Sequence, residues 1–282
     1  MIIALFPNIK KKTAKNLALG IREFLTSQDV TVVADDADAD YIEAQPLSSV
    51  DKNEIDFLIS MGGDGTILRL IHKYPELEAP IVGINLGHMG FLADVPISDI
   101  YPSLQDLLNG AYTIEQRIMM EGRTVTGERC FAVNEMVIHR SKNPSLIELA
   151  IHVDGTYLNT FAADGLILAT PSGSTAYSLA AGGPILAPEL DAFVLTPISP
   201  HTISNRPIVF MPGKDIQVQY LSDRDPVEIT FDGFAKHNLR TGEVFHISKS
   251  TRTFNLVNFL RRDFYSTLRS KLGWAGGKIR EY

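Results

Sequence analysis

The stretch Ser60-Met61-Gly62-Gly63-Asp64-Gly65-Thr66-Ile67-Leu68-Arg69 directly follows the apolar run at residues 55–59. A short, continuous apolar run is typical of a strand buried on both faces of a parallel sheet. After the glycines, Ile67, Leu68, Leu70 and Ile71 have helical spacing. The sequence therefore predicts a strand, a glycine-rich turn and a helix in immediate succession, which is the repeating step of a helix-layered parallel sheet.

The same step recurs through the first part of the chain. Further apolar runs predict strands at residues 2–6, 30–33 and 81–84. Helical spacing follows the first of them, with Thr13 as the expected N-cap and with apolar positions at Ala14, Leu17, Ala18, Ile21, Phe24 and Leu25. Strands that alternate with helices indicate a parallel sheet covered by helices.

Past about residue 115 the hydrophobic period changes from 3.6 to 2. Residues 147–153 alternate between apolar and other side chains, and Asp154-Gly155 then supplies a tight hairpin turn before a strand at 156–161. Other strand-like runs occur at 130–139, 165–169, 216–220, 227–231 and 244–248. Pro, Gly, Asn and Asp clusters separate them, which favours a packed β-sandwich.

We therefore expect an α/β amino-terminal domain with a parallel sheet and an all-β sandwich as the carboxyl-terminal domain. The expected boundaries are 1–105 for the α/β domain, 106–255 for the sandwich and 256–282 for a carboxyl-terminal helix and tail. That helix is predicted from the four-residue spacing of Leu256, Leu260, Phe264, Leu268 and Leu272. We expect it to pack on the α/β domain or on a neighbouring subunit.

Composition narrows the class of protein. The chain has 282 residues, of which 45% are hydrophobic, enough for a substantial core. Its formal net charge of −7 argues against a nucleic-acid surface, which needs a concentrated positive field. No run approaches the roughly 18 apolar residues of a membrane helix, and no leader pattern opens the sequence. With a single cysteine, Cys130, and no possible internal disulfide, we expect a cytoplasmic protein.

The glycines Gly62, Gly63 and Gly65 suit a ligand-binding turn. Glycine is required where the backbone takes positive φ or where a ligand comes too close for a Cβ atom. If Thr66 begins the helix, the turn is an anion site suited to phosphates. Asp64 would repel phosphate unless it holds a cation or accepts a proton, and the alternative is an Asp-Gly turn whose aspartate bonds its own backbone.

A second group of small and hydroxyl residues follows the strand predicted at 165–169. It runs from Thr170 to Ser178 and continues into a Gly-Gly-Pro at 182–184. Its N–H groups and hydroxyls are hydrogen-bond donors for a polar ligand, although a structural loop has the same composition. With Asn134-Glu135 and Asp164 as further polar candidates, we expect the ligand in a cleft between the two domains.

Several motifs in one order resemble the NAD kinase family. They are Gly62-Gly63-Asp64-Gly65, Asn134-Glu135, Asp164-Gly165, the run from Thr170 to Ser178, Pro197-Ile198-Ser199-Pro200-His201-Thr202 and Ser204-Asn205-Arg206-Pro207. The resemblance extends from Leu5 to the tail that ends at Trp274. It implies ATP-dependent phosphorylation of NAD at the 2′-hydroxyl of its adenosine ribose, which gives NADP.

The resemblance also implies roles for individual residues. Asp64 would be the catalytic base, while Gly62, Gly63, Gly65 and Thr66 would hold the ATP phosphates. The NAD-binding residues would be Asn134, Glu135, Asp164, Ser172, Thr175, Ala176 and Tyr177. Mg²⁺ or another divalent cation would arrive with ATP, without a protein metal site, and the active form would be a homodimer or homotetramer.

Two positions depart from the family pattern. Leu92 stands where an aromatic residue is common, and Phe234 replaces the glutamine of a frequent Asp-Gly-Gln, so Asp232 receives no role at this stage. A lipid kinase of the diacylglycerol or sphingosine type shares the Gly-Gly-Asp-Gly loop and is an alternative, as is a non-catalytic NAD(P)-sensing module. We expect His88 and His201 to be structural.

Overall fold

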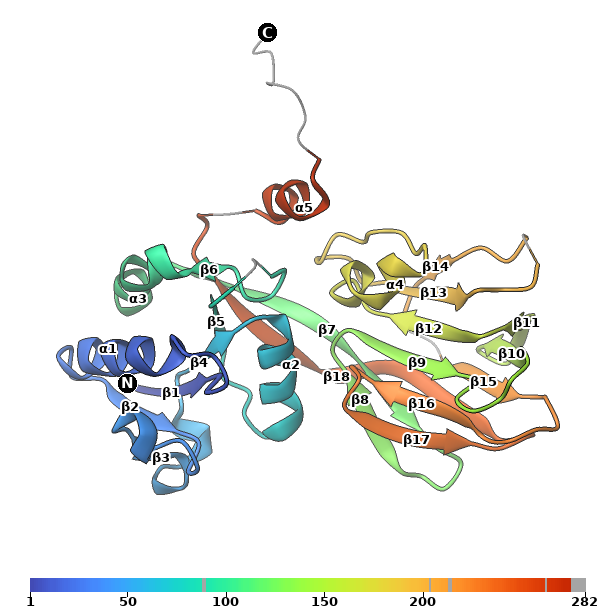
Figure 1. Cartoon of the computed structure of the whole chain (residues 1–282), viewed down its shortest axis with the longest axis horizontal. Helices are drawn as coiled ribbons and strands as arrows, with labels where there is room; N and C mark the ends of the chain where they lie inside the picture. The colour runs from blue at the N-terminus through green and yellow to red at the C-terminus, as the bar shows by residue number, and fades with distance from the viewer. Residues whose placement is uncertain (88–89, 203, 213–214, 262, 275–282) are drawn as a thin grey trace, which may run out of the picture. The chain divides into compact units, whose positions relative to one another are not determined.

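The computed structural model describes residues 1–87, 90–202, 204–212, 215–261 and 263–274. The chain forms two compact units (Figure 1). Unit 1 combines Met1–Gln116 with the segment from Asn255 onward, and unit 2 is Arg117–Phe254. Unit 2 is therefore inserted between two segments of unit 1. The ligand cleft expected between two domains stays a prediction.

Unit 1 contains a parallel sheet. Its strands are β1 (Ile2–Pro7), β2 (Thr31–Ala34), β3 (Gln45–Pro46), β4 (Phe57–Gly62), β5 (Ile81–Asn85) and β6 (Val95–Pro96). They pair in the order β6-β5-β4-β1-β2-β3, and every pair is parallel. This confirms the four strands predicted from apolar runs. Strand β2 pairs with one edge of β1, and β4, which comes later in the chain, pairs with the other edge. The carboxyl ends of β1 and β4 therefore form a topological switch point.

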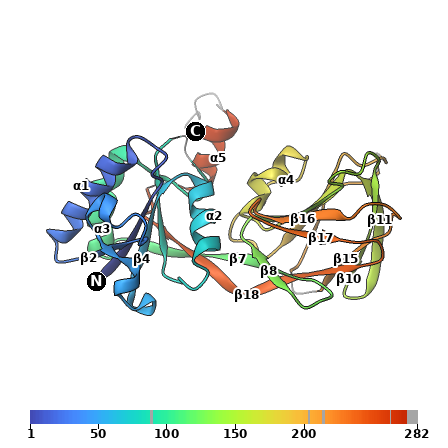
Figure 2. The ribbon, with the colours of Figure 1, turned by 60° about the horizontal axis from the view of Figure 1, so that its bottom comes forward.

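Helices cover both faces of this sheet (Figure 2). They are α1 (Ala14–Thr26), α2 (Asp64–Lys73) and α3 (Ile100–Leu108), with α5 (Phe264–Leu272) near the end of the described chain. Helices α1 and α3 lie on one face, where Ile21 and Leu104 are fully buried, and α2 lies on the other. No helix among the described residues is long and apolar enough to cross a membrane.

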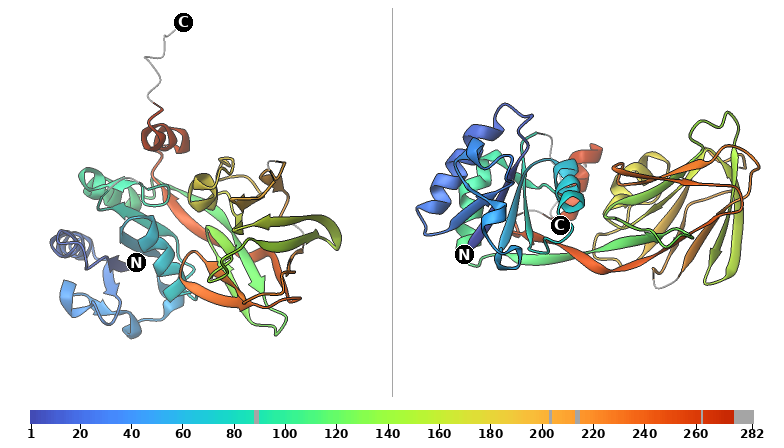
Figure 3. Two further views of the ribbon diagram at one scale, coloured as in Figure 1. Left: turned by 45° about the vertical axis from the view of Figure 1, so that its right-hand side comes forward. Right: turned by 90° about the horizontal axis from the view of Figure 1, so that it is seen from below.

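Unit 2 consists of two layers of strands (Figure 3). Its elements are β7 (Thr113–Arg123), β8 (Arg129–Ala132), β9 (Glu135–His139), β10 (Ile147–Val153), β11 (Thr156–Ala163), β12 (Gly165–Ala169), α4 (Tyr177–Ala180), β13 (Phe193–Ile198), β14 (Ile208–Phe210), β15 (Ile216–Tyr220), β16 (Val227–Phe231), β17 (Ala235–Leu239) and β18 (Val244–Asn258). The first residues of β7 and the last residues of β18 belong to unit 1.

One layer has the order β14-β13-β12-β9-β16-β17 and is entirely antiparallel. In the other, β11, β10, β15 and β18 pair antiparallel in that order. Apolar side chains from both layers form one core that includes Phe161, Phe193, Phe231 and Phe245. The predicted all-β sandwich is thus confirmed.

Two predictions about individual elements were wrong. Leu256 lies in β18, where it pairs in parallel with Ile81, and Leu260 has a φ of 57°; helix α5 begins only at Phe264. Pairing with the sheet of unit 1 outweighs a four-residue spacing that a strand can also contain. The run at 130–139 forms two strands, β8 and β9, because residues 133–134 leave the sheet.

Candidate active site

The glycine turn connects β4 to α2 at the switch point of unit 1. Helix α2 begins at Asp64, two residues before the predicted Thr66, because the Thr66 N–H already donates to the Gly63 carbonyl at 2.8 Å. A Cβ atom at Gly62 would lie 2.0 Å from Thr66 Oγ1, whereas at Gly63 or Gly65 it would meet no atom within 4 Å. Gly62 is therefore required by packing, and the other two leave open space above the turn.

Backbone strain does not explain these glycines. The described glycines with positive φ lie elsewhere in the chain, and Gly63 is extended at φ −157°. Of the two reasons for glycine considered above, only close approach fits Gly63 and Gly65.

The Asp64 carboxylate binds the backbone of a second loop. Its Oδ2 accepts the N–H of Phe91 at 2.8 Å, and its Oδ1 accepts those of Leu92 and Ala93 at 3.0 and 2.9 Å. Gly90 lies so close that a Cβ atom there would be 1.7 Å from Asp64 Oδ1. Asp64 thus does more than bond its own turn, since it ties the start of α2 to residues 90–93.

The loop at 90–93 is braced from two sides. The buried Asn85 at the end of β5 accepts the Gly87 N–H at 2.7 Å and donates from Nδ2 to the Ala93 carbonyl at 3.1 Å. The Phe91 ring lies 5.9 Å from the Phe264 ring of α5. Leu92 is a buried core residue whose N–H reaches Asp64. His88, expected to be structural, lies outside the described residues.

A cavity of about 180 Å³ opens at the switch point, beside the glycine turn. Strand β1 supplies its Phe6 and Pro7, followed by Asn8 and Lys10, and α2 supplies Thr66 and Arg69. Its charged lining also includes Asp35 and Lys73, which form an ion pair. Thr66, a predicted phosphate-binding residue, therefore borders a cavity with several charged lining residues, at the place where open parallel sheets bind ligands.

In unit 2, two of the predicted NAD-binding motifs lie against each other. The Thr170 N–H donates to the Asn134 carbonyl at 2.8 Å, and Thr170 Oγ1 donates to the Val133 carbonyl at 2.7 Å. A Cβ atom at Gly173 would lie 2.1 Å from the Asn134 carbonyl oxygen. Glycine at 173 is therefore what permits the turn after β12 to contact the segment before β9.

The rest of the turn after β12 continues towards Glu135. Thr175 Oγ1 donates to the Ser172 carbonyl at 3.1 Å, and the Ala176 N–H donates to the Gly173 carbonyl at 2.9 Å. Helix α4 then begins at Tyr177, whose backbone lies next to the Glu135 carboxyl group. Ser172, Thr175, Ala176 and Tyr177 thus form one short segment next to Asn134 and Glu135.

Asp164 lines a cavity of about 730 Å³ in unit 2, together with residues of the segment just described. The cavity is lined by three of the predicted residues, Glu135, Asp164 and Tyr177. Arg140, also in the lining, forms an ion pair with Asp164 at 2.8 Å. The cavity is large enough for a small-molecule ligand.

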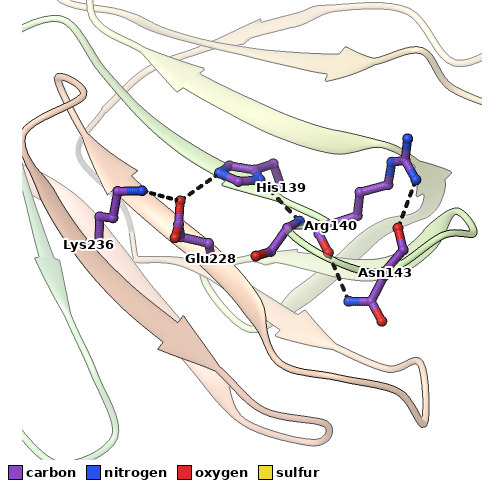
Figure 4. Close-up of polar contacts among 6 residues, drawn as sticks. His139, Arg140, Asn143, Glu228 and Lys236 are labelled. Carbon is purple, nitrogen blue, oxygen red and sulfur yellow. Dashed lines mark hydrogen bonds and ion pairs between the residues drawn. The ribbon is translucent and has the colours of Figure 1, made fainter.

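The polar network at the end of β9 extends the wall of this cavity (Figure 4). Glu228 accepts from Lys236 at 3.0 Å and lies 3.0 Å from His139 Nε2, while Arg140 Nη1 donates to the Asn143 carbonyl at 2.7 Å. Sequence reasoning missed His139 and Arg140, although a His-Arg pair at the end of a predicted strand is a visible signal.

Asp232 is the other residue that sequence reasoning left without a role. It precedes Gly233 in the hairpin between β16 and β17, and its carboxylate accepts the N–H groups of Val133, Asn134 and Glu135 at 2.7, 2.8 and 3.0 Å. The contact joins residues almost a hundred positions apart, which no local pattern reveals.

Two acceptor atoms at this place have no hydrogen-bond partner among the described residues. Asn134 Oδ1 and Glu135 Oε2 are both buried and unpaired. Burial, together with the nearby charge of Asp232, raises the pKa of Glu135 to about 8. Buried unpaired acceptors are rare in folded proteins, so we expect a water molecule or a ligand to donate to these two atoms.

Comparison with known proteins agrees with this architecture. Residues 3–112 match the model of the ATP-NAD kinase N-terminal domain, and residues 133–259 match that of the ATP-NAD kinase C-terminal domain. The chain is 58% identical over 275 residues to an NAD kinase of Protochlamydia amoebophila, covering 98% of this chain and 99% of that one. An NAD kinase of Moorella thermoacetica is 36% identical, with 98% and 90% covered.

Two solved structures have the same fold. An NAD kinase from Archaeoglobus fulgidus in complex with ATP superposes with a TM-score of 0.77 at 29% identity and covers 98% of this chain and 100% of that one. Yeast NADH kinase complexed with NADH gives a TM-score of 0.89 over 100% of this chain and 90% of that one; at 24% identity it supports the fold alone.

The fold and the two motif clusters define a nucleotide-binding phosphotransferase built from an α/β unit and a β-sandwich unit. The chain belongs to the NAD kinase family, whose members form NADP from NAD and ATP. Its activity is that of an NAD kinase. This family and activity take the place of the two alternatives considered from the sequence, a lipid kinase and a non-catalytic sensing module.

Proposed function

We propose that the chain transfers the γ-phosphoryl group of ATP to the 2′-hydroxyl of the adenosine ribose of NAD, with Asp64 as the general base. The observation that carries this proposal is the hydrogen bonding of Asp64. An ionised carboxylate offers about four acceptor positions. Three are used by the N–H groups of residues 91–93, two of them at Oδ1. Among the described residues, Oδ2 accepts one N–H and has capacity for one more donor.

That remaining position suits the ribose hydroxyl. The hydroxyl would donate its hydrogen bond to Asp64 Oδ2, and the proton would pass to Oδ2 as the ribose oxygen bonds the γ-phosphorus and ADP leaves. Phosphoryl transfer has a loose transition state, so positioning and charge neutralisation matter more than a strong base. A carboxylate held by three N–H groups is well positioned for this role.

The glycine turn supports binding of the donor. Open space above Gly63 and Gly65 allows phosphates to approach the backbone. The amino-terminal end of α2, directly after it, favours negative charge. Lys10, Arg69 and Thr66 line the neighbouring cavity.

A divalent cation such as Mg²⁺ would arrive with the ATP phosphates and neutralise their charge. The described residues contain no group of three or more His, Cys, Asp or Glu placed to hold a metal ion. Mg²⁺ usually keeps several waters and binds through phosphates, so it needs few protein ligands. Chelation should therefore abolish NADP formation while NAD binding remains.

NAD would bind in unit 2 through the segment formed by Asn134 and Glu135 and the turn after β12. The unpaired Asn134 Oδ1 would accept a hydrogen bond from adenosine, and the unpaired carboxyl oxygen of Glu135 would exchange a hydrogen bond with it. Ser172, Thr175, Ala176 and Tyr177 would line the adenine and ribose, with Asp164 on the nicotinamide side. Assembly as a homodimer or homotetramer stays a prediction, which sedimentation of the purified protein would test.

Replacement of Asp64 by asparagine tests the central claim. Asp64→Asn should lower kcat for NADP formation by roughly 10² to 10⁴ if Asp64 acts as general base. NAD binding should persist, because its residues lie in unit 2. Asp51→Asn is the matched control: Asp51 also accepts a backbone N–H at the start of a helical turn in unit 1, and should keep full activity. An Asp64→Asn protein as active as the parent would contradict the role of Asp64.

A further inference from the structure

We propose that Asp232 is a positioning residue for NAD: its carboxylate fixes the backbone of residues 133–135 so that the Asn134 and Glu135 side chains face the ligand. The inference rests on the proposed NAD-binding roles of those two residues. Asp232 does not itself need to contact NAD for this function.

The contact is specific in geometry. Three consecutive N–H groups converge on one carboxylate, two on Oδ1 and one on Oδ2. The Asp232 N–H donates in return to the Glu135 carbonyl at 3.0 Å. A carboxylate that accepts several N–H groups forms charge-assisted bonds, which are stronger than neutral ones. The segment between β8 and β9 therefore has one preferred backbone conformation.

The hairpin holds Asp232 in place. Asp232 and Gly233 have φ values of 49° and 75°, in the left-handed region. Aspartate and asparagine tolerate this region better than most other residues with a side chain. The Phe234 N–H donates to the Phe231 carbonyl at 2.8 Å and closes the turn. Replacing Asp232 by asparagine should therefore keep the turn and remove the charge.

The charge of Asp232 also affects Glu135. The first cause of the raised pKa of Glu135 is burial, and the second is the charge of Asp232. At neutral pH Glu135 is then mostly protonated, so it donates one hydrogen bond to a ligand and accepts others. The other titratable or charged residues in the lining of the same cavity are His139, Arg140, Lys142, Asp164 and Tyr177.

This arrangement predicts how NAD binding depends on pH. In the parent, kcat/KM for NAD should fall above about pH 8, as Glu135 ionises. Asp232→Asn should raise KM for NAD about tenfold, because donors around the segment lose an acceptor. It should also move the alkaline fall to lower pH, since removal of the negative charge eases the ionisation of Glu135.

The test measures kcat/KM for NAD against pH in four proteins: the parent, Asp232→Asn, Glu135→Gln and Asp154→Asn. Asp154 is the matched control, because it also precedes a positive-φ glycine in a hairpin and accepts a backbone N–H, from Asp215. It lies in the other sheet of unit 2, so Asp154→Asn should leave the profile unchanged. Glu135→Gln should lack the alkaline fall.

The outcomes separate the two proposals. If Glu135→Gln binds NAD as the parent does at every pH, the proposed NAD site is wrong. If Glu135→Gln changes the profile and Asp232→Asn does not, only the role of Asp232 is wrong. If Asp232→Asn lowers kcat/KM for NAD by the same factor at every pH, Asp232 has only a structural role and the proposal is overturned. If Asp232→Asn does not fold, Asp232→Glu is used, because it keeps the negative charge but changes the position of the carboxylate. Asp232→Glu should raise KM for NAD and leave the alkaline fall of kcat/KM at the same pH as in the parent. A KM equal to that of the parent would overturn the proposal.

Discussion

At the scale of single residues, Gly90 and Gly63 need glycine for different reasons. A methyl group at Gly90 would overlap the Asp64 carboxylate, whereas one at Gly63 would enter open space. Gly90→Ala should therefore displace Asp64 and lower kcat about 10²-fold, the usual cost of a misplaced catalytic group. Gly63→Ala should fold like the parent and chiefly weaken ATP binding. Kinetics with varied ATP, beside thermal unfolding, distinguish the two, and a fully active Gly90→Ala would refute the contact.

Glu135 makes the stability of the protein depend on pH. Its pKa is raised from 4.5 to about 8 in the folded chain. Between these values the unfolded state has lost the proton and the folded state retains it, so the free energy of unfolding falls as pH rises, by up to about 1.4 kcal/mol per pH unit. Glu135→Gln cannot titrate, so it should unfold at higher temperature than the parent at pH 7.5, with a smaller difference at pH 5. Thermal unfolding at both pH values checks this; equal differences would contradict it.

At the scale of elements, helix α5 supports the loop that binds Asp64. Its Phe264 ring contacts Phe91, and the Lys271 ammonium lies 4.6 Å from the centre of the Phe91 ring. Phe264→Ala should lower kcat several-fold with little effect on overall unfolding, since only one edge of the loop loses its packing. Tyr265→Ala, which removes the exposed neighbouring ring, is the control. Equal kcat in both variants would show that α5 does not support the loop.

The elements also show what the sequence predicts and where it fails. Period and apolar runs located β1, β2, β4 and β5, because buried parallel strands are continuous apolar runs. The same reasoning placed a helix over Leu256 and Leu260, where distant pairing with Ile81 decides the structure. Local propensity is a weak guide when a sheet edge offers partners.

The candidate site was predicted unevenly for the same reason. Asp64, Asn134 and Glu135 stand in recognisable motifs, so their positions were visible in the sequence. The partners that hold them were not, because Asp64 bonds residues 91–93 and Asp232 bonds residues 133–135. A hydrogen bond between distant segments leaves no periodic signal.

At the scale of the whole molecule, unit 1 depends on the segment that follows unit 2. Val257 and Phe259 are buried in the core of unit 1. Burying two such side chains contributes roughly 3–6 kcal/mol, a large part of the usual 5–15 kcal/mol of a domain. Residues 1–116 produced alone should therefore be digested quickly by protease, while residues 117–254 should resist it. A protease-resistant 1–116 fragment would contradict this dependence.

The insertion of unit 2 has a consequence for the newly made chain. The first 116 residues emerge from the ribosome early. Their sheet lacks Leu256 and their core lacks Val257 until the whole of unit 2 has been translated. At roughly 5–20 residues per second this delay is on the order of ten seconds. The part of the protein synthesised first is therefore completed last, and during that interval β5 lacks its pairing with β18.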